Sequence, residues 1–518
     1  MPHSRRAILA LLLACGGAQA APDLPPVEAF ARLPTMVSPA LSPDGGTVAY
    51  ITSITRPGQP AAQLVATLDL KSPRHTLLPV LSNSEDNMFR AQWCGWANDT
   101  RLLCSFGTVT YINGNASGIS RLVAVNSDGS KRKVLIQNGL AGASQFHDRI
   151  LDWTPDDPDT VLIELDDDGD AKPSVFALNV NTGALRQHDR ERPPIRHFVA
   201  DGHGHVRIGW GLDHEDISYF ARLDGDLEWR RLATFKAFSG VDVLAPLAVI
   251  PGTNKVYAAG PYEGRTALWS IDLEDKTPPQ VLAHHPRADI ENAIFARSDR
   301  RLIGIGYDTE KPAVFYVDAN AEAVIDAVGK LLPDHTISIE DTSRDEQVYL
   351  LRASNDIDAG RYYILDGRHG DTLTQIGIAY PELDPKTLGR MQPIIYPARD
   401  GTTIPGYLTV PPGTAAKNLP LVVMPHGGPI ARDRWEFDFL RAFLVSRGYA
   451  VLQMNFRGSA GYGSDWFYAA HQDWGGLSYD DVTDGARWAI AQGIADPRRV
   501  AIVGWSFGGY IALLGATR

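Results

Sequence analysis

The sequence predicts a two-part fold, a seven-bladed β-propeller followed by an α/β domain with a parallel sheet. At 518 residues the chain is too long for a single hydrophobic core. A pattern of turns and short strands repeats from Ser38 to about Ile378, and strands alternate with helical segments after Pro381. Hydrophobic residues at 44% and charged residues at 21% exclude a disordered or fibrous protein. A net charge of −12 argues against nucleic acid as a partner.

The first twenty residues have the three parts of an export signal. A basic start at Arg5 and Arg6 precedes an apolar run from Ala7 to Cys15, and the small-residue sequence Ala18-Gln19-Ala20 follows it. We therefore expect a signal peptide over residues 1–20, an N-terminal segment over 21–37, and a periplasmic or secreted protein. The alternative is a lipobox ending at Cys15, which would leave a lipid anchor there. No later apolar run reaches the roughly 18 residues that a transmembrane helix requires, so we expect no membrane span.

The repeated region, residues 38–380, predicts the propeller. Strands rich in β-branched and aromatic residues, such as TVAYIT, RLLCSF, TVLIEL and QVYLLRA, each follow a polar turn. The turn centres recur every 46 to 57 residues, the spacing of a four-stranded blade; they are Asp44, Asp99, Asp156, Gly202, Thr253, Asp299 and Asp345. An irregular sandwich of short strands is the alternative.

Two cysteines flank one of these turns. Cys94 and Cys104 lie symmetrically about Asp99, so they can face each other across a hairpin. An exported protein meets an oxidising compartment, which favours a disulfide. Because the loop sequence alone does not fix the hairpin register, two buried free thiols remain the alternative.

Residues 381–393 are predicted to form a linker, and residues 394–518 the α/β domain. LVVMPHGG and AVLQMNFRG are expected to form buried strands, and VAIVGWS a third buried strand. The segment from Asp433 to Tyr449 has helical apolar spacing and meets Gly448 as a C-terminal cap. A second helix is expected in SYDDVTDGARWAIAQG, and GGYIALLGA is compatible with a third.

The last strand leads into Gly504-Trp505-Ser506-Phe507-Gly508, which fits G-x-S-x-G. In this motif small residues let a serine occupy a tight strand-to-helix turn, where its hydroxyl is exposed. The motif alone is weak, but a buried strand precedes it and a helix-compatible segment follows. We therefore predict Ser506 as a nucleophile.

Acyl transfer also requires backbone N–H donors for the oxyanion. The N–H of Phe507 is one candidate, and the loop His426-Gly427-Gly428-Pro429 after an earlier strand can supply another. His426 itself lies upstream of Ser506, whereas this type of site has its histidine downstream. We therefore expect His426 to brace the loop.

Taken together, these motifs resemble the prolyl oligopeptidase family of serine peptidases, close to its acylaminoacyl-peptidase and dipeptidyl-peptidase branch. The residues that carry the resemblance are HGGP at 426–429, NFRGSAGYG at 455–463, DWGG at 473–476, DPRRVAIVGWSFGGY at 496–510 and ARDGTTIPGYLTVP at 398–411. The resemblance implies an α/β-hydrolase domain, Ser506 as catalytic nucleophile, and the N–H groups of Gly428 and Phe507 as oxyanion hole. It also implies short peptide substrates, a propeller that restricts access to the site, and neither cofactor nor metal.

Two features depart from the family pattern. Asp152-Trp153 is followed by Thr154-Pro155 and not by the tandem glutamates that grip a free N-terminus, which puts dipeptidyl specificity in doubt. No Asp, Glu or His follows Ser506, so we expect the catalytic domain to be represented by its N-terminal part only, and the chain to be inactive by itself.

Two other functions are compatible with the sequence. An esterase or lipase would share the elbow and the HGG loop without needing a propeller. A non-catalytic propeller that binds a partner fits a chain without a triad acid and base.

Overall fold

The computed structural model describes residues 24–518 except 55–61, 73–76, 83–87, 113, 137–143, 167–171, 238–242 and 298. The predicted signal peptide and Cys15 lie outside the described residues. Helix α1 (Val27–Ala31) precedes the first strand and packs against the C-terminal part of the chain. Among the described helices, none is long and apolar enough to cross a bilayer.

Small antiparallel sheets, here called A to G, fill the region from Val37 to Ile378, and in each of them consecutive strands are neighbours. Sheet A contains β1 (Val37–Leu41), β2 (Thr47–Ile54), β3 (Ala62–Asp69) and β4 (Leu77–Ser82). Sheet B contains β5 (Arg90–Trp96), β6 (Arg101–Ile112), β7 (Asn115–Asn126) and β8 (Lys133–Val134). Sheet C contains β9 (Ile150–Asp152), β10 (Thr160–Leu165), β11 (Ser174–Asn179) and β12 (Leu185–Asp189). Sheet D contains β13 (His197–Ala200), β14 (Val206–Asp213), β15 (Asp216–Ala221) and β16 (Arg230–Lys236).

Sheet E contains β17 (Ala245–Val249), β18 (Lys255–Tyr262), β19 (Arg265–Asp272) and β20 (Gln280–Ala283). Sheet F has three strands, β21 (Ile290–Phe295), β22 (Leu302–Asp308) and β23 (Pro312–Tyr316), followed by helix α2 (Ala319–Leu331). Sheet G contains β24 (Thr336–Thr342), β25 (Val348–Asn355), β26 (Asp358–Asp366) and β27 (Thr372–Ile378), with the 3-10 helix η1 (Gly367–His369) before its last strand.

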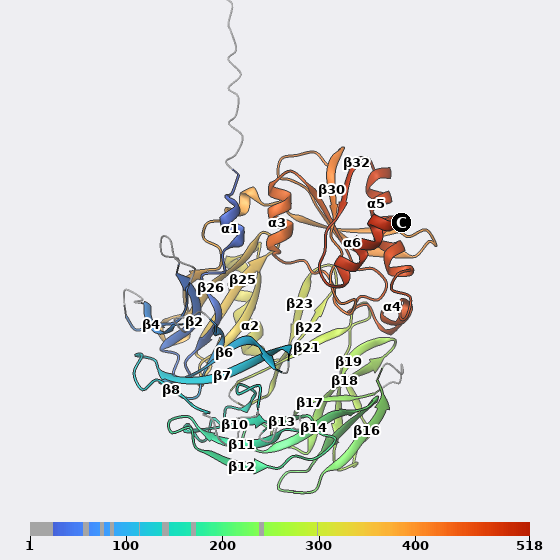
Figure 1. Cartoon of the computed structure of the whole chain (residues 1–518). Coiled ribbons are helices and arrows are strands. Elements are labelled where there is room, and N and C mark those ends of the chain that lie inside the picture. The colour runs from blue at the N-terminus through green and yellow to red at the C-terminus, as the bar shows by residue number, and fades with distance from the viewer. Residues whose placement is uncertain are drawn as a thin grey trace, which may run out of the picture.

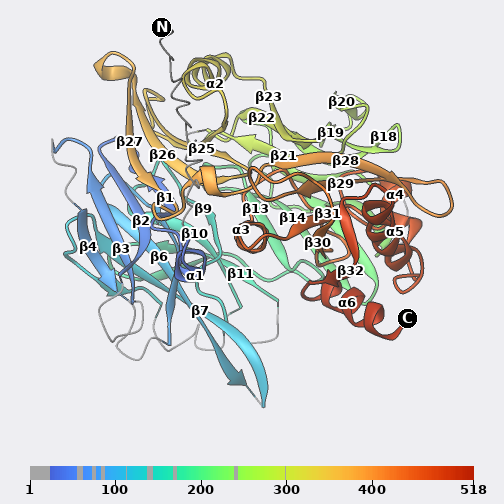
Figure 2. The same ribbon diagram turned by 90° about the horizontal axis from the view of Figure 1, so that it is seen from above.

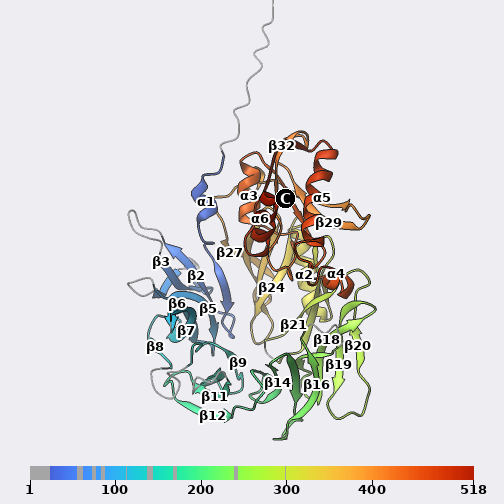
Figure 3. The same cartoon turned by 45° about the vertical axis from the view of Figure 1, so that its right-hand side comes forward.

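The small sheets pack side by side in a closed ring. Separate hydrophobic clusters join A to B, B to C, C to D, D to E, E to F and F to G. A further cluster joins G back to A, where Leu350 packs with Leu41 and Val48. First strands of neighbouring sheets contact each other, as β1 does with β5 and β24, so these strands lie on the inside of the ring. Figures 1 and 3 show the small sheets following one another below the C-terminal domain.

Helix α2 is a feature that the sequence analysis did not predict. Asp318 caps its start by accepting a hydrogen bond from the Ala321 N–H at 2.9 Å. Its buried residues Ala321 and Val328 are seven apart and therefore lie on one face. This helical spacing was present in the sequence and could have identified the element.

The C-terminal domain is built on sheet H, with strand order β28-β29-β31-β30-β32. Its strands are β28 (Met391–Pro397), β29 (Thr403–Thr409), β30 (Leu419–Val423), β31 (Ala450–Met454) and β32 (Ala495–Ile502). The last three pair in parallel, as predicted from the alternation of strands and helices. Strand β28 and the 3-10 helix η2 (Pro385–Thr387) begin inside the segment predicted as a linker.

Helices cover both faces of sheet H. Helix α3 (Phe439–Ser446) packs on one face through Val445, against Val422 and Val451. Helices α5 (Leu477–Ala491) and α6 (Phe507–Thr517) pack on the other, and α4 (Ser464–Ala469) lies before α5 (Figure 2). Alternate side chains of each buried strand therefore pack against helices on opposite faces of the sheet.

Two sequence predictions for this domain are wrong in detail. The helix expected from Asp433 begins only at Phe439, because Asp438 caps it by accepting from the Arg441 N–H at 2.6 Å. The sequence places VAIVGWS at an edge of this sheet, and β32 is indeed the edge strand of sheet H in the described residues, but its predicted burial is wrong because Ala501 is exposed. An edge strand has a neighbour on one side only, which leaves its outer side in solvent.

Candidate active site

Ser506 stands at the junction between β32 and α6. Its backbone has φ 52° and ψ −123°, a region that non-glycine residues rarely adopt, and its side chain is exposed. The two flanking glycines allow this turn. A Cβ on Gly504 would lie 2.6 Å from the carbonyl carbon of Gly508, and a Cβ on Gly508 would lie 2.2 Å from the carbonyl oxygen of Pro425. The geometry is that of a nucleophile elbow, with the hydroxyl presented at the start of a helix.

The loop after β30 lies against this elbow. A Cβ built on Gly427 would lie 3.6 Å from the Cβ of Ser506, an ordinary contact distance, so this loop lies directly beside the serine. Gly428 follows with φ +119°, a value that favours glycine. Phe507 is the first residue of α6, where backbone N–H groups have no partner inside the helix. The structure thus brings the loop of Gly427 and Gly428 and the residue Phe507 to the same serine, and the choice of Gly428 as donor stays a prediction.

The hydrogen-bond partners of His426 are residues other than Ser506. Its Nε2 lies 2.8 Å from Ser459 Oγ, and its Nδ1 lies 2.7 Å from the carbonyl oxygen of Gly427. The ring stacks on Phe456 with centroids 4.3 Å apart. Burial lowers the pKa of His426 to about 4, so the ring is neutral at pH 7. Both ring nitrogens are engaged within the loop and its support, which agrees with the expected bracing role.

Arg457 and Asp481 support the site from behind, a role that the motif did not reveal. Arg457 Nε and Nη2 bond Asp481 Oδ2 and Oδ1 at 3.0 and 2.6 Å, and the Arg457 N–H donates to Oδ2 at 2.9 Å. Asp481 is fully buried on α5. Arg457 also bonds Asp400 at 2.5 Å, and Ser478 Oγ donates to the backbone carbonyl oxygen of Arg457. The carboxylates of Asp481 and Asp400 hold the pKa of Arg457 above its ordinary value. This network fixes the segment that carries Phe456 and Ser459, which hold His426.

A small cavity of roughly 130 Å³ lies next to the elbow. His426, Gly427 and Trp505 line it together with Asp433, whose Oδ1 accepts from Gln453 Nε2 at 3.0 Å. Burial raises the pKa of Asp433 to about 8, so this carboxyl group is largely protonated at pH 7.

Ion pairs connect the loop after Gly428 to sheet F of the ring. Arg432 Nη1 bonds Glu291 at 3.0 Å, and Arg434 bonds both Glu291 and Asp308. The side chain of Arg432 is nearly fully buried. Opposite charges that are desolvated in this way fix the loop relative to the ring.

Cys94 and Cys104 form a disulfide in the structure. They are directly opposite in the β5–β6 register, with Cα atoms 4.1 Å apart. Asp152, which precedes Trp153, is a structural residue: its carboxylate accepts from the N–H groups of Thr154, Gly202 and Gly204.

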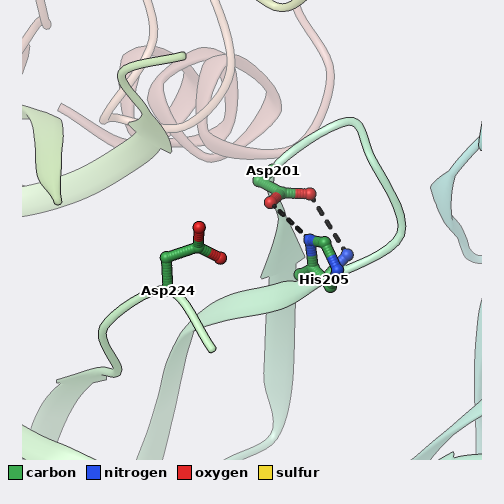
Figure 4. A group of neighbouring side chains, drawn as sticks. All are labelled: Asp201, His205 and Asp224. Atoms are coloured by element: carbon green, nitrogen blue, oxygen red, sulfur yellow. Dashed lines mark hydrogen bonds and ion pairs between the residues drawn. The ribbon is translucent and has the colours of Figure 1, made fainter. Parts of the chain in front are cut away.

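The described residues contain one group with metal-ligating side chains close enough to hold an ion, formed by Asp201, His205 and Asp224 (Figure 4). Asp201 already accepts from the His205 ring and from backbone N–H groups of its own turn. Asp224 lies 3.6 Å from the cationic Arg207. These internal partners account for the cluster, so it carries no metal assignment.

The fold and site define a class of protein, an α/β-hydrolase domain with a serine elbow, joined to a ring of small antiparallel sheets. Residues 435–518 match the prolyl oligopeptidase family, and the resemblance inferred from the motifs is confirmed.

Two relatives align over most of this chain. Dipeptidyl aminopeptidase BIII of Pseudoxanthomonas mexicana is 27% identical over 372 residues, which are 70% of this chain and 53% of the relative. Dipeptidyl peptidase family member 6 of Caenorhabditis elegans is 26% identical over 424 residues, 76% of this chain and 56% of the relative. The chain thus spans about half the length of these relatives.

Solved structures share the fold. A puromycin-hydrolyzing peptidase of Mycobacterium tuberculosis superposes with a TM-score of 0.66 at 18% identity, over 95% of this chain and 76% of that one. The Pyrococcus horikoshii acylaminoacyl peptidase gives a TM-score of 0.60 at 14% identity, over 94% of this chain and 75% of that one. At these identities the likeness concerns the fold alone.

Proposed function

We propose that the protein is a serine hydrolase that cleaves short peptides through an acyl-enzyme, as an oligopeptidase or aminopeptidase. The observation that carries the proposal is the strained elbow of Ser506 with the glycine loop of Gly427 and Gly428 beside it. Attack by the Ser506 hydroxyl on a peptide carbonyl would form the tetrahedral intermediate, and the N–H groups of Gly428 and Phe507 would stabilise its oxyanion. The family match and the peptidase relatives favour a peptide over another acyl substrate.

The ring contributes substrate selection in this proposal. We interpret sheets A to G as the blades of a seven-bladed propeller, closed by the hydrophobic cluster between G and A. A ring placed against the catalytic domain would limit access to short peptides. An esterase would need no such ring, and a binding module would need no strained serine.

Labelling by a fluorophosphonate tests the proposal. Protein expressed from the intact gene in its host should be labelled at Ser506, and a Ser506→Ala variant should not. The same protein, assayed without the fluorophosphonate, should hydrolyse short peptide anilides faster than short acyl esters. Preference for esters would favour the esterase, and absence of labelling would favour the binding module.

We further propose that the polypeptide of residues 21–518 does not turn over peptides by itself. Residues 507–518 contain no Asp, Glu or His, and His426 is engaged elsewhere. Without a base, only the residual acceleration from the oxyanion hole remains, roughly 10³ to 10⁴-fold over water. Anilide turnover by this polypeptide that vanishes on Ser506→Ala would contradict this.

Export remains a proposal that rests on the N-terminal sequence. Mass spectrometry of protein from the native host should find a mature N-terminus near Ala21. A retained Met1 would contradict export, and a lipidated Cys15 would favour the anchor.

A further inference from the structure

One side chain of sheet F reaches four other sheets of the ring. Arg297, which follows β21, bonds Asp341 of β24 in sheet G at 3.1 Å. Its guanidinium donates to the carbonyl oxygens of Leu41 in sheet A, at 3.5 Å, and Trp96 in sheet B, at 2.5 Å. It also lies 5.6 Å from the ring centroid of Trp153, which follows β9 of sheet C.

These contacts place Arg297 near the axis of the ring. Leu41, Trp96, Asp341 and Trp153 all lie at or near the ends of first strands, which are the inner strands. Sheets A, B and C are not neighbours of sheet F in the ring, because sheet G separates F from A. A side chain from F that contacts all of them must extend across the opening.

Arg300 in the same β21–β22 connection extends the crossing to sheet D. A Cβ on Gly202, between β13 and β14, would lie 2.4 Å from Arg300 Cγ. Among the described residues, a cavity beside Arg297 is lined by Pro43, Trp96 and Trp153; its volume is roughly 50 Å³, which is too small for a peptide chain.

The closed end is the one remote from the catalytic domain. Arg297 lies in a first-to-second strand connection, at one end of the sheets. The catalytic domain contacts second-to-third connections, such as Asp308 and Thr309 in sheet F and Asp356 in sheet G. In antiparallel sheets successive connections lie at opposite ends.

We propose that Arg297 plugs the remote end of the ring, so that peptides reach Ser506 only from the side of the catalytic domain. The bulk of its side chain closes the opening, whereas its bonds to Asp341, Leu41 and Trp96 are not required for the closure. The consequence for substrate entry rests on the proposed peptidase function, whereas the closure itself does not.

Two variants separate the bulk of the Arg297 side chain from its hydrogen bonds: Arg297→Ala removes both, and Arg297→Met removes the hydrogen bonds but keeps most of the bulk. Arg344→Ala is a matched control. Arg344 lines the same cavity, but its ion pair with Asp99 is exposed. In protein from the intact gene, we expect Arg297→Ala to raise kcat/KM for a long peptide about tenfold relative to a tripeptide. Arg297→Met should keep the wild-type ratio although it loses the same hydrogen bonds, and Arg344→Ala should also keep it.

A second measurement does not depend on activity. Thr342→Cys places a thiol in the cavity beside Arg297, and it should react with a bulky maleimide only when combined with Arg297→Ala. Equal reaction of this thiol with and without the Arg297→Ala substitution would overturn the closure, as would an unchanged peptide-length ratio in Arg297→Ala. An equal change in Arg297→Met would show a loosened ring and would overturn it too. Missing fluorophosphonate labelling of Ser506 in the wild type would contradict the proposed function alone.

Discussion

Asp481→Asn should destabilise the catalytic domain far more than its size suggests. The carboxylate is fully buried and accepts three hydrogen bonds from Arg457, two from the guanidinium and one from the backbone. The asparagine amide removes the negative charge and directs its NH₂ group, a donor, at the N–H donors of Arg457. Breaking a buried ion pair on one side typically costs about 3 to 5 kcal/mol, because the remaining charge stays buried without its partner.

Differential scanning fluorimetry and urea unfolding measure the loss. At about 4 °C per kcal/mol, where the values for smaller and larger domains meet, the melting transition of the catalytic domain should fall by roughly 12 to 20 °C. The ring should unfold in a separate transition that moves little, since multidomain chains rarely unfold in one step.

Asp400→Asn is the matched control, because it removes the other carboxylate on the same guanidinium. The Asp400 side chain is 41% exposed, so water can replace its bond to Arg457. The control should therefore melt close to the wild type. Equal melting temperatures for the two variants would refute the reasoning that burial, and not charge alone, sets the cost.

Three other predictions concern the site and the ring. The pKa of His426 is about 4 in the folded protein against 6.5 in the unfolded chain, so the neutral ring contributes on the order of 3 kcal/mol of stability above pH 6.5, and this is lost as pH falls from 6.5 toward 4. The difference in Tm between wild type and His426→Gln should therefore narrow over that range, and a constant difference would contradict this prediction. Gly508→Ala should abolish fluorophosphonate labelling, because its Cβ would lie 2.2 Å from the Pro425 carbonyl oxygen, whereas Gly509→Ala, with its nearest atom at 3.3 Å, should retain part of it. Replacing Cys94 and Cys104 by alanine should cost less than the roughly 3 kcal/mol of a 15-residue loop, and peptide mapping without reductant that finds two free thiols would argue against the disulfide.

Local signals predicted most of the strands. TVAYIT lies within β2 and QVYLLRA overlaps β25, because their β-branched residues and flanking turns act over a few neighbouring positions. The helix from Asp433 failed because tertiary contacts overrode its apolar spacing: Arg434 bonds sheet F, and Trp435 packs with Met391 and Tyr407.

For the candidate active site, too, only the features that arise from residues adjacent in sequence were predicted. The elbow was predictable because its glycines and serine are adjacent in sequence. The partner of His426 is Ser459, 33 residues later, and Arg297 meets the Trp96 carbonyl across 201 residues. Nothing in one sequence indicates contacts of that range.

Sheet F has two attachments, and they have a consequence for protein engineering. Through Glu291 and Asp308 it grips the loop beside the nucleophile, and through Arg297 it spans the far mouth of the ring. A chimaera that grafts this catalytic domain onto another propeller would therefore have to carry strands β21 to β23 along with it. Sheet G would have to be kept as well, because Asp356 accepts from Arg441 of the catalytic domain and Asp341 accepts from Arg297. Sheets F and G together are therefore the part of the ring to preserve when this protein is recombined.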